Sequence, residues 1–179
     1  VDIYSTAPGS SYISESGTSM ATPIVSGVSA LILSKNPFLS PAEVTNILQK
    51  SSVDLGTKGR DKYFGYGRVD AYKALLKTPV PVTNITTSSK TFTYAGTSRI
   101  SLSFSANKGT NISIYIKNAN NTIIRRLVIN QKWNGGTFST KWDGKMDNQA
   151  YAPKGPVKVL VRVTNGKHTV DKGTSVTIK

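Results

Sequence analysis

Seven consecutive residues, most of them small or polar, precede a long apolar run, and one of them has the chemistry of a nucleophile. The apolar run over residues 24–33 predicts a buried helix, with Ser19 at its N-terminus. Free backbone N–H groups and the positive end of the helix dipole meet at such a place and favour developing negative charge. Acyl transfer needs that environment beside its nucleophile. The stretch reads Gly17-Thr18-Ser19-Met20-Ala21-Thr22-Pro23.

A purely structural interpretation competes with the catalytic one. Serine and threonine are common before helices, where their side-chain oxygens accept hydrogen bonds from open backbone N–H groups. On this interpretation Thr18 or Ser19 is only a helix cap. The residue types of the stretch alone leave both interpretations open.

The seven-residue stretch resembles the nucleophile motif of the subtilisin-like serine proteases (subtilases), and the resemblance spans about residues 1–76. Residues 5–9 (Ser-Thr-Ala-Pro-Gly) and 64–71 (Phe-Gly-Tyr-Gly-Arg-Val-Asp-Ala) resemble the family at matching separations. The resemblance implies a serine endopeptidase that hydrolyses peptide bonds of a protein or peptide substrate. Ser19 would be its nucleophile and would donate its own backbone N–H to the oxyanion, with support from Thr18.

The other catalytic groups that the resemblance implies are missing. In subtilases the chain order is Asp, His, an oxyanion Asn and then Ser, and this sequence holds only the last. Residues 1–80 contain no His, and His168 lies beyond a stiff linker, so we do not expect it to be the base. We therefore predict that this chain is inactive as a peptidase by itself. Its expected partner is the N-terminal part of the protease, which carries the Asp and the His. No cofactor is expected, and calcium would bind only in that missing part.

Charge and composition suggest two modules in the 179 residues. Residues 1–80 carry eight Lys/Arg and six Asp/Glu, whereas residues 81–179 carry fifteen and three. The basic half suits an anionic partner such as a cell-wall polymer, or its charge merely keeps it in solution. The alternative function is therefore a non-enzymatic binding or targeting module. Nucleic acid is not expected, because the basic residues lack interleaved aromatics.

Several features of the sequence bear on where the protein is located. The sequence has no Cys and begins at Val1 without a signal segment. No apolar run approaches the 18 or more residues of a spanning helix, so no membrane span is expected. With the family resemblance, these features predict a fragment of a longer secreted or cell-surface protein of bacterial origin.

Local signals divide the chain at its proline-rich stretch. We expect the C-terminal portion of a peptidase domain over residues 1–77, a linker over 78–82 and a basic Ig-like β-sandwich over 83–179. In the first part, residues 10–16 are expected to be a polar loop, and Pro23 to lie in the first turn of its helix. Ser40 and Asp70 should cap two further helices.

Strand-like alternation dominates the second part. Residues 100–104, 112–116, 123–129 and 157–163 alternate or cluster apolar residues like short strands, which predicts a sandwich. Residues 142–148 resemble the Ig-like domain of flagellar hook-capping proteins, which implies a binding or spacer module. Residues 143–148 are expected to form a turn rather than a metal site, and Trp133 and Trp142 to pack rather than bind sugar. The expected fold class is mixed: a fragment of an α/β subtilisin-like domain, mainly helical as it stands, plus an all-β Ig-like sandwich.

Overall fold

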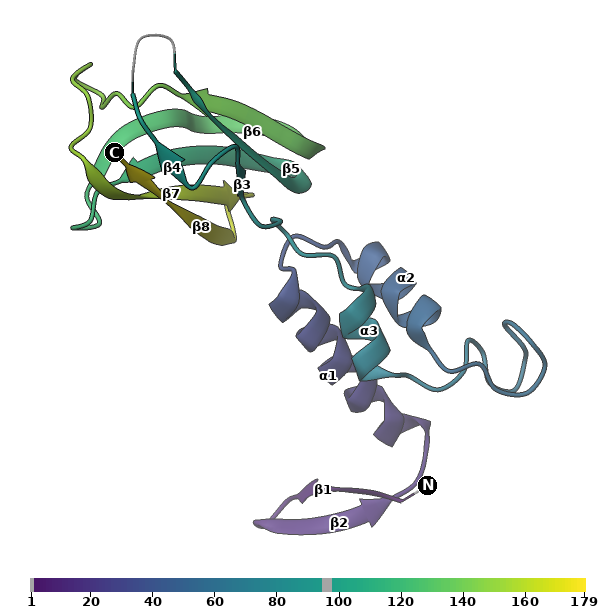
Figure 1. Cartoon of the computed structure of the whole chain (residues 1–179). Helices are drawn as coiled ribbons and strands as arrows, with labels where there is room; N and C mark the ends of the chain where they lie inside the picture. The colour runs from purple at the N-terminus through teal and green to yellow at the C-terminus, as the bar shows by residue number, and fades with distance from the viewer. Residues whose placement is uncertain (1, 95–97) are drawn as a thin grey trace. The chain divides into compact units, whose positions relative to one another are not determined.

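The computed structural model describes residues 2–94 and 98–179 and separates into two compact units (Figure 1). The first unit, Val1–Pro79, contains a short hairpin and three helices, and the second, Val80–Lys179, contains one large sheet. Of the helices that the structure describes, none is long and apolar enough to cross a membrane.

A small hydrophobic core joins the three helices of the first unit. They are α1 (Thr18–Lys35), α2 (Pro41–Ser51) and α3 (Ala71–Lys77). Val28 and Ile32 of α1 meet Val44 and Ile47 of α2 and Ala74 of α3, all with less than a tenth of their surface exposed. The contact involves the middle and C-terminal turns of α1, so the turn that carries Ser19 lies outside this core.

Side-chain caps fix where α2 and α3 begin, as the sequence predicts. The Ser40 hydroxyl accepts from the Glu43 N–H at 3.4 Å, and the Glu43 carboxylate accepts from the Ser40 N–H at 2.8 Å, completing a capping box. Asp70 accepts from the Lys73 N–H at 2.8 Å. These bonds satisfy donors that have no partner within the helix, and they confirm both predicted caps.

The predicted polar loop over residues 10–16 is wrong, because that segment pairs as a strand. Strand β1 (Ile3–Ala7) and strand β2 (Ser11–Glu15) form an antiparallel hairpin over five residue pairs. Gly9 turns the chain with φ of 78°, and the rings of Tyr4 and Tyr12 stack across the strands at 5.4 Å. The cross-strand aromatic pair and the tight turn stabilise the hairpin. Residues 1–6 alternate like a short strand, as β1 confirms, whereas β2 has too few apolar residues for its pattern to predict a strand.

One six-stranded sheet makes up the second unit. Its strands run in the order β3-β5-β7-β8-β4, and β6 pairs with β5 from one end of both strands to the other. All pairs are antiparallel except β4 with β8. The bounds are β3 (Thr86–Thr87), β4 (Thr91–Phe92), β5 (Ile100–Lys117), β6 (Ile123–Trp142), β7 (Gly155–Thr164) and β8 (Thr169–Ile178).

The fold class expected from the sequence is wrong. Strand accounts for 45% of the structure and helix for only 21%, and the described part of the second unit forms a curled sheet rather than two separately paired sheets. The physical reason is the length of β5 and β6, which span 18 and 20 residues and run through segments that resemble turns. Irregularities in their pairing, including one between Lys108 and Thr110, let long strands bend without breaking the ladder.

The sheet unit has its own core, and Trp142 lies in it. Its side chain has no exposed surface, and its indole N–H donates to the Lys145 carbonyl at 2.8 Å. The predicted packing role of Trp142 is therefore confirmed. Trp133, the only other tryptophan, lies on the same strand β6 and contacts the Phe138 ring edge-on at 5.0 Å. Tryptophan fluorescence thus reports on this unit alone.

We expect residues 80–179 to fold without the first unit, because their core draws on their own strands. Urea unfolding followed by tryptophan fluorescence should give the same transition midpoint for the isolated segment and for the whole chain. A shallow, non-cooperative change in the isolated segment would contradict independent folding.

Candidate active site and cationic face

Ser19 lies in the first turn of α1, and no side chain caps that end of the helix. The N-cap residue is Gly17, with φ of 151°, and the first helical bond runs from the Ala21 N–H to the Gly17 carbonyl at 3.2 Å. Thr18 and Ser19 are therefore inside the helix rather than before it. The interpretation in which either one is only a cap does not hold.

The open helix end leaves donors at the candidate nucleophile. The N–H groups of Thr18, Ser19 and Met20 precede the first helical bond, so helix geometry gives them no partner inside α1. The Ser19 side chain itself is exposed. A hydroxyl and backbone donors thus occupy one turn, which is the combination that stabilises negative charge on an attacked carbonyl oxygen.

Pro23 lies one turn later than the sequence suggests. Because α1 begins at Thr18, Pro23 falls in the second turn and not in the first, where its missing N–H would be harmless. The Ser19 carbonyl therefore cannot receive the usual bond from residue 23. The Thr22 hydroxyl donates to the neighbouring Thr18 carbonyl at 3.0 Å, so a side-chain bond supplements the first turn without replacing the one that the Ser19 carbonyl lacks.

A hollow of about 370 Å³ lies beside Ser19, between the hairpin and α1. Ser5 from β1, Glu15 from β2, and Ser19 and Pro23 from α1 are among the residues that line it. Its lining supplies a nucleophile and one carboxylate, but no imidazole. The hollow can hold part of an extended ligand, yet it lacks a histidine base for the serine proton.

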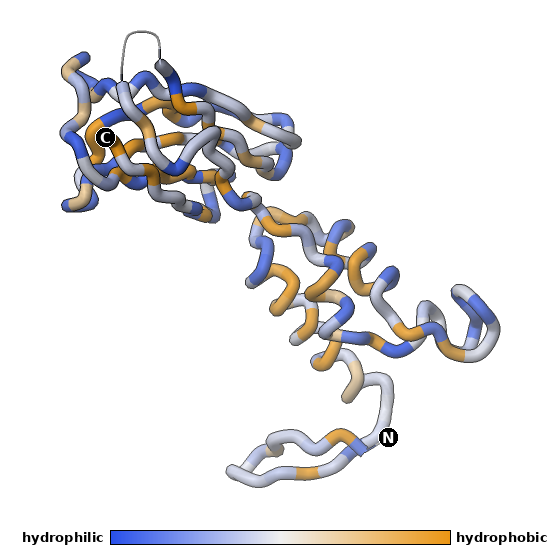
Figure 2. Tube along the Cα trace, viewed as in Figure 1, coloured by the Kyte–Doolittle hydropathy of each residue, from blue (hydrophilic) through white to orange (hydrophobic). Residues whose placement is uncertain are grey.

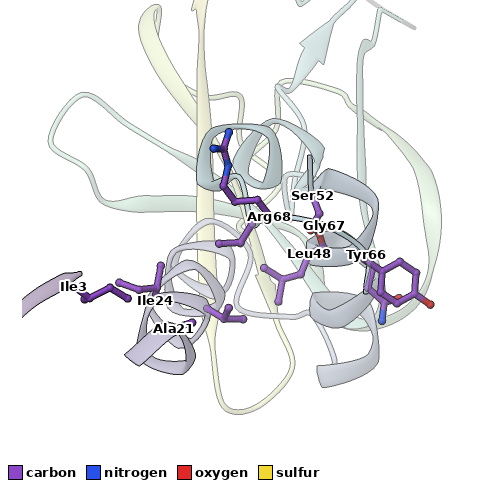
Figure 3. A pocket seen from close by; sticks show the side chains of 11 residues that line it. Ile3, Ala21, Ile24, Leu48, Ser52, Tyr66, Gly67 and Arg68 are labelled. Atoms are coloured by element: carbon purple, nitrogen blue, oxygen red, sulfur yellow. Dashed lines mark hydrogen bonds between the residues drawn. The ribbon is translucent and has the colours of Figure 1, made fainter. Parts of the chain in front are cut away.

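A second and larger hollow of about 580 Å³ lies among α1, α2 and the segment after residue 65 (Figure 3). Ala21 and Ile24 of α1 line it together with Leu48 of α2, and Tyr66 and Arg68 of the later segment also belong to its lining. Apolar residues continue along much of α1 (Figure 2). Ile24 keeps 48% of its surface exposed and Leu31 keeps 49%.

Sequence reasoning placed Ser19 at a helix start but missed Glu15 and the exposed side of α1. The position of Glu15 beside Ser19 is not predicted from the sequence, because residues 10–16 are expected to be a loop and not a strand. The apolar run of α1 predicts burial on most sides, whereas only Val28 and Ile32 of the helix are fully buried. The length of the apolar run could have indicated the exposed side of α1. One small three-helix core cannot cover so many apolar side chains, so some of them must stay exposed.

The sheet unit carries a separate group of charged side chains. Arg126 pairs with Asp147 at 2.6 Å, and Arg162 pairs with Asp171 at 2.8 Å. Hydrogen bonds from Arg162 lower the pKa of Asp171, and the charges of Lys117 and Lys158 lower it further. Among residues 2–94 and 98–179, no three His, Cys, Asp or Glu side chains are grouped to hold a metal ion.

Comparison with known proteins relates the first unit to proteases. Residues 2–67 match the model of the subtilase family. The chain is 45% identical over 74 residues to subtilisin DY of Bacillus licheniformis, covering 41% of this chain and 26% of that protein. It is 39% identical over 64 residues to an extracellular serine protease of Serratia marcescens, covering 36% of this chain and 6% of the other. The chain thus spans about a quarter or less of these relatives.

The comparison with solved structures bears on the expected Ig-like character of the second unit. A crystal structure of FlgD from Pseudomonas aeruginosa aligns over 48% of this chain and 67% of its own, with 19% identity and a TM-score of 0.38. A likeness at that level carries no argument about function. The expected Ig-like character of this unit therefore finds only loose support.

We expect Asp171 to titrate below the ordinary value of 3.8 for an aspartate, since Arg162, Lys117 and Lys158 all favour its charged form. Because the pKa is lowered in the folded state, the ion pair stabilises the fold above pH 4 and loses that contribution as pH falls through the depressed value. Carboxyl-carbon NMR should report the low midpoint. Arg162→Gln should move it upward, and an unchanged midpoint in that variant would contradict the assignment.

Proposed function

We propose that this chain is the C-terminal portion of a secreted bacterial subtilisin-like serine endopeptidase, with Ser19 as its nucleophile. The observation that carries the proposal is the position of Ser19 in an uncapped first helical turn, exposed and beside a hollow, within a segment that matches the subtilase family. The extracellular Serratia relative supports secretion.

The proposed chemistry is acyl transfer to the serine hydroxyl. The Ser19 Oγ bonds to the carbonyl carbon of a peptide while its proton passes to a histidine base, and the carbonyl oxygen becomes an oxyanion. The Ser19 backbone N–H donates to that oxyanion. Collapse of the tetrahedral intermediate breaks the C–N bond, and the base returns the proton to the leaving amine. Water then releases the acyl group by the same steps.

The base and its orienting carboxylate belong to a partner, the N-terminal part of the protease. Residues 1–80 hold no histidine, so nothing near Ser19 in sequence can take the proton as an imidazole does. Without triad partners, serine proteases retain only about 10³–10⁴-fold catalysis over water. The chain alone is therefore inactive in an ordinary peptidase assay.

The exposed side of α1 suits that partner. Ile24 and Val25 line the larger hollow and remain 48% and 39% exposed, although both belong to an apolar helix. Burying an exposed isoleucine fully contributes about 1.5–3 kcal/mol. Association through this face would cover apolar surface and bring the missing catalytic groups toward the first turn of α1.

We expect a fluorophosphonate probe to label the isolated chain barely, and to label it readily after the N-terminal part is added as a separate chain or by fusion. Ser19→Ala should abolish labelling and casein cleavage in the reconstituted protein. Thr22→Ala, a change of similar size in the same motif, should retain labelling. Labelling at another serine, or cleavage by Ser19→Ala, would overturn the proposed nucleophile.

We expect Ile24→Ser to change the stability of the isolated chain by less than about 0.5 kcal/mol, because the side chain is half exposed there. The same change should weaken assembly with the N-terminal part by about 1–3 kcal/mol, measured by calorimetric titration. Leu76→Ser in α3, where the side chain is 64% exposed, is the matched control and should assemble normally. Equal effects of the two changes would argue against docking through α1.

A second candidate function rests on the charge of the sheet unit. Residues 81–179 carry fifteen Lys/Arg against three Asp/Glu, a net charge of +12. We propose that this unit binds an anionic surface polymer and so targets the protease to it. Steep weakening of binding with rising salt would support this function, because dispersed charges are screened over about 10 Å at 0.1 M salt.

A further inference from the structure

Three cations lie on one side of the sheet where β5, β7 and β8 run together. We call this group, formed by Lys117, Lys158 and Arg162, the cationic face. Lys117 and Lys158 lie directly opposite each other across the β5–β7 pair, and Arg162 lies opposite Asp171 across the β7–β8 pair. The alternate residues of β7 are buried valines on the other side of the sheet. One carboxylate therefore faces three positive charges.

Like charges at opposed positions of neighbouring strands destabilise a sheet. Arg162 already donates two hydrogen bonds to the Asp171 carboxylate, at 2.9 and 2.8 Å. Asp171 therefore offsets the repulsion between Lys117 and Lys158 only in part. The arrangement costs stability in the free protein, and a bound anion would remove that cost.

Strand β8 leaves space for the Lys158 side chain. A methyl group on Gly173 would lie 2.7 Å from the Lys158 Cε and 3.7 Å from its Nζ. The φ of Gly173 lies outside the left-handed range, so the backbone does not require glycine here. Glycine at this position instead lets the Lys158 side chain cross the surface of β8.

A hollow of about 460 Å³ adjoins Lys158, next to the turn that follows β5. Asn118, Asn121 and Ser175 line it together with Lys158. The side-chain Oδ1 of Asn118 accepts from the Thr122 N–H at 2.9 Å, which leaves the side-chain N–H₂ of Asn118 as a donor. The hollow thus combines an ammonium group, an amide and a hydroxyl, which are groups that contact phosphate oxygens in nucleic-acid complexes.

We propose that this hollow and the adjoining cationic face bind a phosphate group of a linear phosphate polymer. This inference rests on the second proposed function, that the sheet unit binds an anionic polymer, and it names the site and the chemical class. Lys158 would contact the phosphate oxygens, with Ser175 and Asn118 donating beside it. Lys117 would neutralise the neighbouring charge along the polymer. Lysine suits this task because its ammonium acts as a compact point charge toward phosphate.

The test uses the whole chain and fluorescently labelled linear polyphosphate, with affinity followed by anisotropy across a salt series. Lys158→Gln should weaken binding several-fold and lower the slope of log Kd against log salt by about 1, as loss of one phosphate contact does. Gly173→Ala should weaken binding without changing net charge, since it displaces the Lys158 side chain. Lys172→Gln is the control of matched charge, because Lys172 lies on the neighbouring strand β8 opposite Val161, on the other side of the sheet from Lys158.

Stability provides a second measurement. Lys158→Gln removes a like-charge contact, so its Tm should equal or exceed that of the wild-type chain while its affinity falls. A lower Tm together with weaker binding would assign Lys158 a structural role and overturn the proposal. Equal losses for Lys158→Gln and Lys172→Gln would also overturn it, leaving polymer binding by dispersed charge intact.

Two further outcomes distinguish failure of the phosphate site from failure of the proposed polymer-binding function. If the wild-type chain binds neither polyphosphate nor polyglutamate at low salt, both the site and the polymer-binding function are overturned, whereas binding of polyglutamate alone overturns only the phosphate site. Polyglutamate of matched length should bind more weakly than polyphosphate. Equal affinity for the two polymers would overturn the assignment to phosphate while leaving the anionic-polymer function in place.

Discussion

The contact of α1 with α2 and α3 holds the first unit together and sets what the candidate site can do. Val28 and Ile32 are the buried residues of α1, and they lie two to four turns away from Ser19. The first turn of α1 is therefore held in place only by the packing of the later turns of the same helix. Its accessible hydroxyl, its free N–H donors and its apolar neighbours Ile24 and Val25 all follow from a helix that is packed only over its middle and C-terminal turns.

A single sheet imposes a different constraint on the second unit. Long strands must bend, and the bends need residues that tolerate unusual backbone angles. Gly135 and Gly136 have φ of 92° and 85° within β6, where an alanine would be strained. The strands consequently keep their pairing through segments that would otherwise end them, and β5 reaches Lys117, where it joins Lys158 and Arg162 of β7 in the cationic face.

Local signals in the sequence predicted the helix caps, because the hydrogen bonds made by Ser40, Glu43 and Asp70 join residues only three positions apart. The same local reasoning failed for β5 and β6. Glycines such as Gly109 and Gly135 are typical of turns, but pairing with a distant strand keeps them inside the ladder. The candidate nucleophile was found from its motif and helix. The exposed side of α1 and the opposition of Lys117 to Lys158 depend on tertiary packing and strand register, which no local window contains.

The opposition of Lys117 and Lys158 makes salt act on this protein in two directions. Mobile ions screen the repulsion across the β5–β7 pair, and the screening distance shortens from about 10 Å at 0.1 M to about 3 Å at 1 M. The same ions compete with any polyanion for the lysines. For a sheet unit that binds a polyanion as proposed, rising ionic strength would therefore weaken the binding while it relieves the repulsion between Lys117 and Lys158. A rise in the salinity of the surroundings would then release the protein without removing this contribution to the stability of the sheet.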